Sequence, residues 1–422
     1  MVNEVRDPVH NFVLFDDFER QLIDSEPVQR LKHIKQLALT CEVYPGATHS
    51  RFEHSLGTME LATQAFDTIV RKKPDALNKL EWGDRDRQHE YRQLLRVGAL
   101  LHDVGHAPFS HAPEALMPDG YSGHETFSAA FIRSEYINPL LRRVTGAFDP
   151  ERVVAVALGA KKIQHESAEI QLLQELVAGD LGADRIDYLL RDALHTGAAA
   201  GRFDYHRLLN TLTVIEHPDT GSPVLAVEEG GLHAAEALLL SRYFMFLQVY
   251  FHHVRRIYDR HLEDFLSSHL PGGRFPAELD DYIQWTDDAL HLAIAEAAGQ
   301  TGDSAQLARR LVGRQHYRRA YEVPPKARGK DIDFFSRLAE HVREQFGDLV
   351  RVDEVGKEPS TLEPGDLYIV DDDGNNPRDI FEVSQLVGLL NPIWLGRVYA
   401  KEDVRHKVNE ACKQFVSQEG AA

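Results

Sequence analysis

Apolar residues recur at helical spacing through most of the first 266 positions of the chain. One such stripe follows Arg51, a second runs from about Glu90 to Leu101, and a long third one runs from Leu232 to Leu266. Steps of three and four residues mark one face of an α-helix, so the pattern predicts a helical core. The stripe after Arg51 consists of Met59, Ala62, Phe66 and Ile69.

The pattern changes after HLPGGRFPAEL, the stretch from His269 to Leu279. Its prolines and glycines are typical of a turn or linker. Helical patches follow at residues 285–297 and 334–346, whereas LVRVDEV and DLYIVDDDGNNPRDIFEV indicate strands, with DDDGNN as a turn. We therefore expect a mainly α protein with a helical core over residues 1–268. A smaller mixed α/β region over residues 269–422 is expected to pack on that core.

Composition narrows the class of protein. A length of 422 residues fits one large domain or two fused ones. The net charge of −19 disfavours nucleic acid and anionic membranes as partners. No long apolar run and no signal-peptide pattern occurs, which indicates a cytoplasmic protein without membrane contact. Because Cys41 and Cys412 lie far apart, any metal must be held by histidine and carboxylate.

Histidine is concentrated in the stretch GALLHDVGHAPFSH. We expect His102 and His106 on one helical face, with Asp103 beside them and Gly105 and Pro108 ending the helix. The alternative is that these are ordinary surface or satisfied core histidines. Burial after an apolar helix disfavours that alternative, because unpartnered polar groups are costly to bury. Imidazole and carboxylate together suit Fe, Mn, Zn or Ni.

Two further stretches offer ligands to such a metal. His54 lies near the start of a helix in HSRFEHSLG, and Asp184 opens the helix in LGADRIDYLLRDALHTG. That second helix carries a polar stripe through apolar sequence, which indicates either a site or a buried ion-pair network. We favour the site, because arginine and tyrosine suit phosphate. The stripe consists of Asp184, Asp187, Tyr188, Arg191 and His195.

These residues resemble the HD-domain metal phosphohydrolases. The resemblance is to the branch of the sterile-alpha-motif/HD deoxynucleoside triphosphate triphosphohydrolases and the bacterial deoxyguanosine triphosphatases. It implies an HD-domain helical core and conversion of a deoxynucleoside triphosphate and water to deoxynucleoside and inorganic triphosphate. The matching blocks run in order over about residues 6–256: DPVHNFV, PVQRLKHIKQL, YPGATHSRFEHSLG, LLHDVGHAPFSH, GHETFS, DRIDYLLRD, FDYHRL and RYFMFLQVYFHH.

The resemblance also implies the site residues. One transition metal (Fe, Mn, Zn or Ni) would be held by His54, His102, Asp103 and Asp184. The triphosphate, accompanied by Mg or Mn, would be gripped by Arg51, Arg185, Tyr188 and Arg242. Arg185 stands where the animal enzyme has lysine. The sugar 3′-hydroxyl would bond to Gln36 and Asp192, while ribose would be excluded by Leu37 and Tyr250.

The implied chemistry is attack of water at the α-phosphorus. The metal lowers the pKa of the bound water and polarises the phosphoryl oxygen. His111 matches the acid that protonates the departing 5′-oxygen. The water would be oriented by His106, His124 and Glu125, with Glu114 where the animal enzyme has aspartate.

Regulation and assembly are open at this stage. Asp24 and Gln29 match the guanine-reading positions of a nucleotide effector site, whereas Lys32 and Phe12 depart from the family pattern. The resemblance implies a homo-oligomer, either dimer or tetramer.

Two other functions stay open. The first is hydrolysis of another phosphate ester, such as a nucleoside monophosphate, a cyclic nucleotide or a guanosine alarmone. The second is a non-catalytic nucleotide-binding regulator. Dependence of activity on the sugar-facing residues would exclude the first, and bound metal with metal-dependent turnover would exclude the second.

Overall fold

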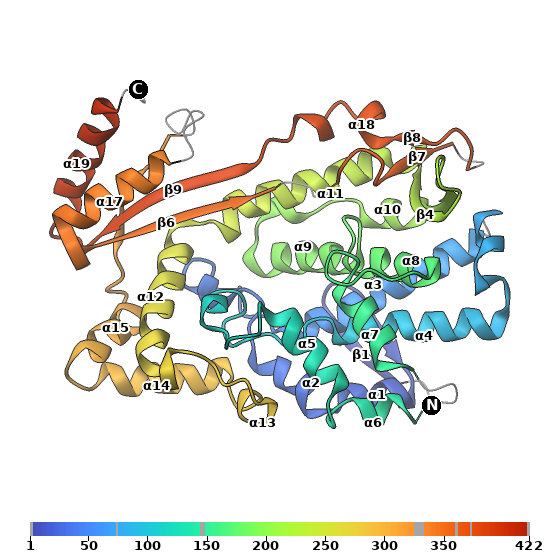
Figure 1. Ribbon diagram of the computed structural model, residues 1–422, viewed down its shortest axis with the longest axis horizontal. Helices are drawn as coiled ribbons and strands as arrows, with labels where there is room; N and C mark the ends of the chain where they lie inside the picture. The colour runs from blue at the N-terminus through green and yellow to red at the C-terminus, as the bar shows by residue number, and fades with distance from the viewer. Residues whose placement is uncertain are drawn as a thin grey trace.

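The computed structural model describes residues 3–72, 75–143, 148–324, 333–358, 362–371 and 374–419. It confirms a mainly α protein with short sheets, most of them involving the C-terminal part (Figure 1). None of the helices in these ranges combines the length and apolarity needed to cross a membrane.

The α-helices are α1 Asp17–Ile23, α2 Glu26–Arg30, α3 Arg51–Lys72, α4 Arg85–Leu101, α5 His124–Arg133, α6 Asn138–Leu141, α7 Pro150–Leu158, α8 Ala168–Ala178, α9 Ala183–Thr196, α10 Tyr205–Thr211, α11 Leu232–Met245, α12 His253–His269, α13 Leu279–Tyr282, α14 Asp287–Ala298, α15 Asp303–Val312, α17 Phe334–Phe346, α18 Ile380–Val383 and α19 Arg405–Gln418. The strands are β1 Asn3–Asp7, β2 Asn11–Phe15, β3 Leu212–Glu216, β4 Pro223–Glu228, β5 Arg318–Glu322, β6 Val350–Lys357, β7 Tyr368–Val370, β8 Arg378–Asp379 and β9 Ile393–Ala400.

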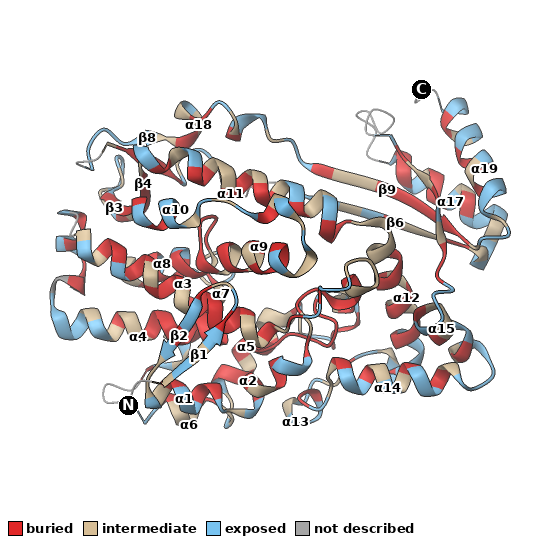
Figure 2. Ribbon diagram, turned by 180° about the vertical axis from the view of Figure 1, so that it is seen from behind, coloured by how far each residue is buried: buried red, intermediate tan, exposed pale blue. Residues whose placement is uncertain are grey.

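Helix α3 is the centre of the core and packs against α4 and α9. The predicted stripe of Met59, Ala62, Phe66 and Ile69 is fully buried, as its helical spacing requires. Helix α4 is exposed over its first half and buried over its second half, so its C-terminal end enters the interior (Figure 2). The buried end of α4 leads directly into the histidine-rich stretch.

Three sheets surround the helical core. Strands β1 and β2 form an antiparallel hairpin, β3-β4-β7-β8 form a second sheet, and β5-β9-β6 form a third. Within the second sheet β4 pairs with β7 in parallel, which joins the first part of the chain to its last quarter. One continuous apolar core contains buried residues from both sides of position 268. Long β6 and β9 run side by side toward α17 and α19 (Figure 1).

The predicted helix from Leu232 to Leu266 is wrong in one respect, because it is two helices. Helix α11 ends at Met245, a π-helical turn follows at Phe246–Tyr250, and α12 begins at His253. The backbone of His252 is extended (φ −58°, ψ 130°), and its ring accepts the Val254 N–H. The apolar period continues across this break, so periodicity could not reveal it.

The strand prediction for DLYIVDDDGNNPRDIFEV is correct for β7 and β8, which pair as a hairpin. It is wrong for the last residues, which form the single helical turn α18. Asp379 caps this turn by accepting the Phe381 N–H at 2.7 Å, as N-terminal aspartates commonly do. Within the predicted DDDGNN turn, positions 372–373 lie outside the described residues.

A buried ion pair fixes β6 to the core. Asp353 accepts hydrogen bonds from Arg256 at 2.7 and 3.0 Å and from Arg260 at 3.0 Å. Burial would raise the pKa of Asp353, but the hydrogen bonds and positive charges of Arg256 and Arg260 together outweigh burial and lower it. The carboxylate therefore stabilises the fold above its unfolded pKa of about 4 and loses that effect as the pH falls further.

Asp353→Asn is therefore expected to lower the free energy of unfolding by about 1–3 kcal/mol at pH 7. The deficit relative to wild type should shrink as the pH falls below about 4, because the carboxyl of the unfolded chain is protonated there first and that of the folded chain only at lower pH. Urea unfolding of both proteins at a series of pH values measures this difference in the free energy of unfolding. Asp348→Asn, at a side chain that is 99% exposed, is the control and should change nothing. A deficit that is independent of pH would contradict the ionic role.

Candidate active site

Four ligand groups from three helical segments converge at the buried end of α4. His54 lies in the first turn of α3, His102 and Asp103 follow α4, and Asp184 lies in the first turn of α9. His54 Nε2 lies 3.3 Å from His102 Nε2 and 3.1 Å from Asp184 Oδ1. His102 Nε2 lies 3.4 Å from Asp103 Oδ1 and 3.7 Å from Asp184 Oδ1. The structure thus brings all four predicted metal ligands together.

The protonated side of each imidazole points away from this centre. His54 Nδ1 donates to Asp187 Oδ2 at 2.7 Å, and His102 Nδ1 donates to the Ala99 carbonyl at 2.7 Å. These bonds fix the tautomer in which both Nε2 lone pairs face inward toward two carboxylates. Burial would lower the pKa of His54, but its bonds with Asp184 and Asp187 raise it to about 10, so that without a metal its Nε2 carries a proton, which a bound cation would replace. A centre of converging acceptors is suited to a cation, and two nitrogen and two oxygen donors suit a divalent transition metal.

The polar stripe on α9 serves two purposes. Asp184 and Tyr188 face the site, whereas Asp187 and Arg191 lie beneath it in a fully buried ion-pair network. Arg191 donates to Asp187 at 2.8 and 2.9 Å and to Asp7 at 2.8 Å. The sequence pattern could not distinguish a functional site from a buried ion-pair network, because both place the same residue types on one helix face.

Two further contacts complete this network. His10 Nε2 lies 2.6 Å from Asp187 Oδ1, so the β1–β2 hairpin also supports the site. Helix α3 can pass close to Asp187 and Arg191 because residue 57 is glycine; a Cβ there would collide with both side chains. Asp187 therefore links the fold of the core to the orientation of His54.

The histidine-rich stretch leaves the helix earlier than expected. Helix α4 ends at Leu101, so His106 is not on the helical face of His102, and that prediction is wrong. Residues 102–105 form a turn that packs on α5, where a Cβ at Gly105 would collide with the backbone of Ser128. The turn still brings His106 Nε2 to 3.2 Å from Asp103 Oδ1.

A second histidine group lies beside the first. The rings of His106 and His124 stack with centroids 3.7 Å apart, and the ring of His111 lies edge-on to both. Glu114 accepts from His111 Nδ1 at 2.8 Å and from His124 Nδ1 at 3.0 Å. Burial would raise the pKa of Glu114, but these two bonds hold it below its usual range. Glutamate at position 114 thus reaches both rings.

The members of this group differ in environment. Burial holds the pKa of His106 well below its usual value, so this ring is neutral. The side chain of His111 is 54% exposed and opens toward solvent. Glu125 lies 3.7 Å from His124 Nδ1 and pairs with Lys162 at 2.9 Å. A neutral buried imidazole and a carboxylate-supported exposed one can hold protons of different acidity.

The predicted sugar-facing residues also gather in one place. Asp192 accepts from Tyr250 Oη at 2.7 Å and from His49 Nε2 at 2.8 Å. Burial and Asp192 raise the pKa of Tyr250 well above its usual value, so its hydroxyl stays protonated. The Gln36 backbone N–H donates to the His49 carbonyl at 3.0 Å, and Leu37 is buried next to it in the chain. His49 was not predicted, because it belongs to no helical stripe.

The predicted phosphate-binding residues lie on three elements. Arg51 on α3 donates to Asp103 and to Ser110 Oγ, and Arg185 on α9 pairs with Asp180. Arg242 on α11 lies 5.2 Å from the Phe246 ring centroid and donates to the Glu358 carbonyl at 2.9 Å. Burial raises the pKa of Tyr188, while nearby Arg242 and Arg185 oppose that rise. Arg185, Tyr188 and Arg242 are therefore neighbours.

One cation near this group comes from outside the resembling blocks. Lys357, at the end of β6, lies 5.6 Å from the Phe246 ring centroid. Burial lowers its pKa, and the nearby positive charges of Arg242 and Arg185 lower it further. No signal in the sequence pointed to Lys357, because strand β6 joins the group only through the fold.

The residues matched to an effector site lie on the surface of the N-terminal part. Gln29 Oε1 accepts from Lys32 Nζ at 2.7 Å, so these two are together. Asp24 pairs with Arg20 at 3.5 Å, and the Phe12 ring lies under the Arg6 guanidinium at 4.8 Å.

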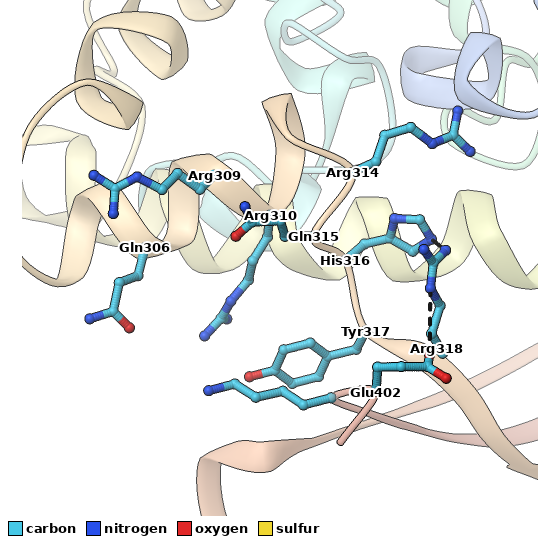
Figure 3. A pocket seen from close by; sticks show the side chains of 10 residues that line it. Gln306, Arg309, Arg310, Arg314, Gln315, His316, Tyr317, Arg318 and Glu402 are labelled. Carbon is cyan, nitrogen blue, oxygen red and sulfur yellow. Dashed lines mark hydrogen bonds and ion pairs between the residues drawn. The ribbon is translucent and has the colours of Figure 1, made fainter. Parts of the chain in front are cut away.

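A separate hollow of about 470 Å³ lies beside α15 and shares no lining residue with the histidine site (Figure 3). Its arginines are held by the protein itself. Arg309 donates to carbonyls of residues 298 and 300, and Arg314 lies 3.8 Å from Glu42. Arg310 lies 4.8 Å from the Tyr317 ring centroid. The hollow is therefore a polar seam between α15 and the β5-β9-β6 sheet. The lining residues are Gln306, Arg309, Arg310, Arg314, Gln315, His316, Tyr317, Arg318, Lys401 and Glu402.

Comparison with known proteins agrees with this geometry. The HD domain family matches residues 51–188, and the HD associated region matches residues 203–419. The uncharacterized protein YwfO of Bacillus subtilis is 34% identical over 331 residues, which are 74% of this chain and 70% of that protein. The crystal structure of a hypothetical protein from Aquifex aeolicus superposes with a TM-score of 0.79 at 34% identity, covering 97% of this chain and all of that one.

A third similarity carries a named activity. The deoxynucleoside triphosphate triphosphohydrolase SAMHD1 homolog of Dictyostelium discoideum is 30% identical over 216 residues. The match covers 50% of this chain and 40% of that protein.

Proposed function

Because the chain belongs to the HD domain proteins that carry an HD associated region, and is thus a metal-dependent phosphohydrolase, we propose that its substrates are deoxynucleoside triphosphates. The products are the deoxynucleoside and inorganic triphosphate. The partial similarity to the Dictyostelium discoideum triphosphohydrolase supports this choice of substrate. The metal would be held by His54, His102, Asp103 and Asp184.

The observation that carries the proposal is a buried hydrogen-bond acceptor without a donor, at a residue predicted to bind the sugar 3′-hydroxyl. Gln36 Oε1 is buried and has no hydrogen-bond partner among the described residues. Such a group is costly unless a ligand supplies a donor, and a sugar hydroxyl is such a donor. Leu37 follows it in the chain, and Tyr250 is held by Asp192. The proposal assigns Leu37 and Tyr250 to the 2′ side of the sugar, where an apolar and an aromatic side chain favour a deoxyribose over a ribose.

The residues of the chain divide the reaction between them. A divalent metal supplies a water of lowered pKa and polarises the α-phosphoryl oxygen when it is bound. Arg185, Tyr188, Arg242 and Lys357 bind the triphosphate by charge and hydrogen bonding. The water oxygen joins the α-phosphorus as the bond to the 5′-oxygen breaks. His111, supported by Glu114 at Nδ1, delivers a proton from Nε2 to that oxygen.

His106 and His124 orient the attacking side. The neutral ring of His106 holds Asp103 through Nε2 and stacks on His124, whose Nδ1 is held by Glu114. Glu125 lies on the outer side of His124. These contacts keep an acid and a proton acceptor in one network, so that the proton lost by water and the proton gained by the 5′-oxygen can balance.

A substrate panel tests the proposal. Deoxy- and ribonucleoside triphosphates are incubated singly and as mixtures with Mn²⁺, Fe²⁺, Mg²⁺ or Co²⁺, and nucleoside and triphosphate are measured. We expect release of deoxynucleoside and triphosphate from at least one deoxynucleotide and much slower reaction with its ribonucleotide. Turnover confined to a monophosphate, a cyclic nucleotide or a guanosine alarmone would replace this substrate class. Nucleotide binding without turnover under any metal would indicate a regulator.

A further inference from the structure

The loop that presents His111 has a constrained backbone. Phe109 and Ser110 both have positive φ, 58° and 57°, although neither is glycine. Side chains other than glycine rarely adopt this region, and such residues persist only where their surroundings hold them. Ser110 Oγ donates to the Lys35 carbonyl at 2.7 Å and accepts from Arg51 Nε at 2.8 Å. The constrained loop is thus tied to the loop that carries Gln36 and Leu37.

Asp287 supplies the second tie between these loops. Asp287 lies at the first position of α14 and is 1% exposed. Its Oδ1 accepts the Phe109 N–H at 2.6 Å, and its Oδ2 accepts the Lys35 N–H at 3.0 Å. One carboxylate therefore bonds to the backbone immediately before the sugar-facing residues and, through its other oxygen, to the backbone two residues before His111.

The ionisation of Asp287 permits both bonds. Burial raises its pKa to about 6, and the bonds from Lys35 and Phe109 oppose that rise. The carboxyl is therefore mostly ionised at neutral pH, and both oxygens act as acceptors. An amide at this position would offer one acceptor and would present its donors to the other N–H.

The segment around Asp287 braces the rest of the same loop. Tyr282 Oη donates to the Gly105 carbonyl at 2.9 Å. Arg30 donates to the Trp285 carbonyl at 2.8 and 3.1 Å and to the His106 carbonyl at 2.8 Å. The histidine-rich loop is therefore held at both ends by a segment more than 170 positions further along the chain.

We propose that Asp287 is a positioning residue that fixes the His111 loop relative to the Gln36–Leu37 loop. The inference rests on the proposed function, because these loops would carry the proton donor and the sugar contacts. Among the described residues Asp287 forms its hydrogen bonds with the Lys35 and Phe109 backbones and none with His54, His102, Asp103 or Asp184, so its effect should be on alignment rather than on metal binding. Small displacements of reacting groups lower kcat strongly, whereas binding of the triphosphate depends on other residues.

The test compares Asp287→Asn and Asp287→Ser with Asp288→Asn. Serine provides a second, smaller substitution with one acceptor oxygen. Asp288 is the neighbouring carboxylate, 72% exposed and paired with the surface residue His33, so it is a matched control. The measurements are metal content, kcat and KM for a deoxynucleotide, the deoxy-to-ribo preference, and amide hydrogen exchange of residues 34–37 and 106–111.

We expect both Asp287 variants to retain the metal and to lose about 10²-fold in kcat with a smaller change in KM. The ratio of kcat/KM for the deoxynucleotide to that for its ribonucleotide should fall by about 10-fold. Both loops should exchange faster, and Asp288→Asn should match wild type. Unchanged kcat and exchange would overturn the inference, as would a loss of activity that only follows loss of the metal.

Failure of the proposed function gives a different result. In that case wild type and Asp288→Asn would also lack deoxynucleotide turnover with every metal. The exchange measurement then still decides whether Asp287 couples the loops: faster exchange in both supports the coupling, and unchanged exchange overturns it.

Discussion

His102→Ala is expected to abolish metal binding and to lower turnover by about 10³-fold or more, which corresponds to about 4 kcal/mol of transition-state stabilisation. The reason is that His102 Nε2 lies within 3.7 Å of His54, Asp103 and Asp184, so that its removal opens the ligand set. The remaining acceptors would then carry uncompensated negative charge. Metal content by mass spectrometry and initial rates at saturating deoxynucleotide measure both effects.

The control for this variant is His233→Ala. The His233 side chain is 91% exposed and pairs with Glu236 on the surface. Its removal should leave metal content and rate as in wild type. Retention of both metal and turnover in His102→Ala would show that another group binds the ion, and the ligand assignment would have to be abandoned.

Arg191→Met is expected to lower the free energy of unfolding by about 3–5 kcal/mol, because removing one partner of a buried ion pair leaves the other charge unpaired. Asp187 and Asp7 are both buried and would lose their shared cation. Asp187 also holds His54 Nδ1, so metal affinity should fall by about 10–100-fold. Urea unfolding at a fixed metal concentration and metal titration measure the two effects.

Arg133→Met provides the matched comparison. Arg133 pairs with Glu151 at 2.6 Å, but its side chain is 48% exposed. An exposed pair contributes about 1 kcal/mol or less, so this variant should stay close to wild type. If Arg191→Met were equally mild, the network beneath α9 would not be a determinant of stability.

The parts of the fold that could be predicted from the sequence are those in which apolar residues recur with a clear helical period. Helix α3 carries a long apolar stripe and was correctly predicted. The short strands β1 to β4 and the edge strand β5 were missed, because strands of five or six residues give little periodic signal within helical surroundings. Strand β9 was missed although it is longer, since its residues are largely buried and show no alternation.

The residues of the candidate site likewise divide into those that could be predicted from the sequence and those that could not. His54, His102, Asp103 and Asp184 could be chosen because the chemistry of metal binding restricts the residue types and the resembling blocks carry them. His49 lies within the block YPGATHSRFEHSLG but was overlooked. Lys357 and Asp287 could not be chosen, because their relevance comes from contacts made only by the folded chain. Asp287 contacts the His111 loop across 178 positions of sequence, with no motif to mark it. In the sequence Asp287 and Asp288 together follow the N-cap Thr286, where acidic residues commonly begin a helix, so nothing distinguished Asp287.

The C-terminal part is therefore integral to the site geometry. Asp287 and Tyr282 hold the histidine-rich loop, and Lys357 and the Glu358 carbonyl lie beside Arg242 and its ring neighbour Phe246. The HD domain match at residues 51–188 contains the four proposed metal ligands, whereas residues that brace the histidine-rich loop lie within the HD associated region at 203–419. Both parts are expected to be needed for turnover.

Phosphorus NMR of the products formed from a deoxynucleoside triphosphate in ¹⁸O-labelled water tests the proposed reaction most directly. We expect one inorganic triphosphate per deoxynucleoside, with the label on a terminal phosphorus of the triphosphate, because water attacks the α-phosphorus and the 5′-oxygen departs unlabelled. Orthophosphate or pyrophosphate as the labelled product would contradict it, and so would label in the nucleoside.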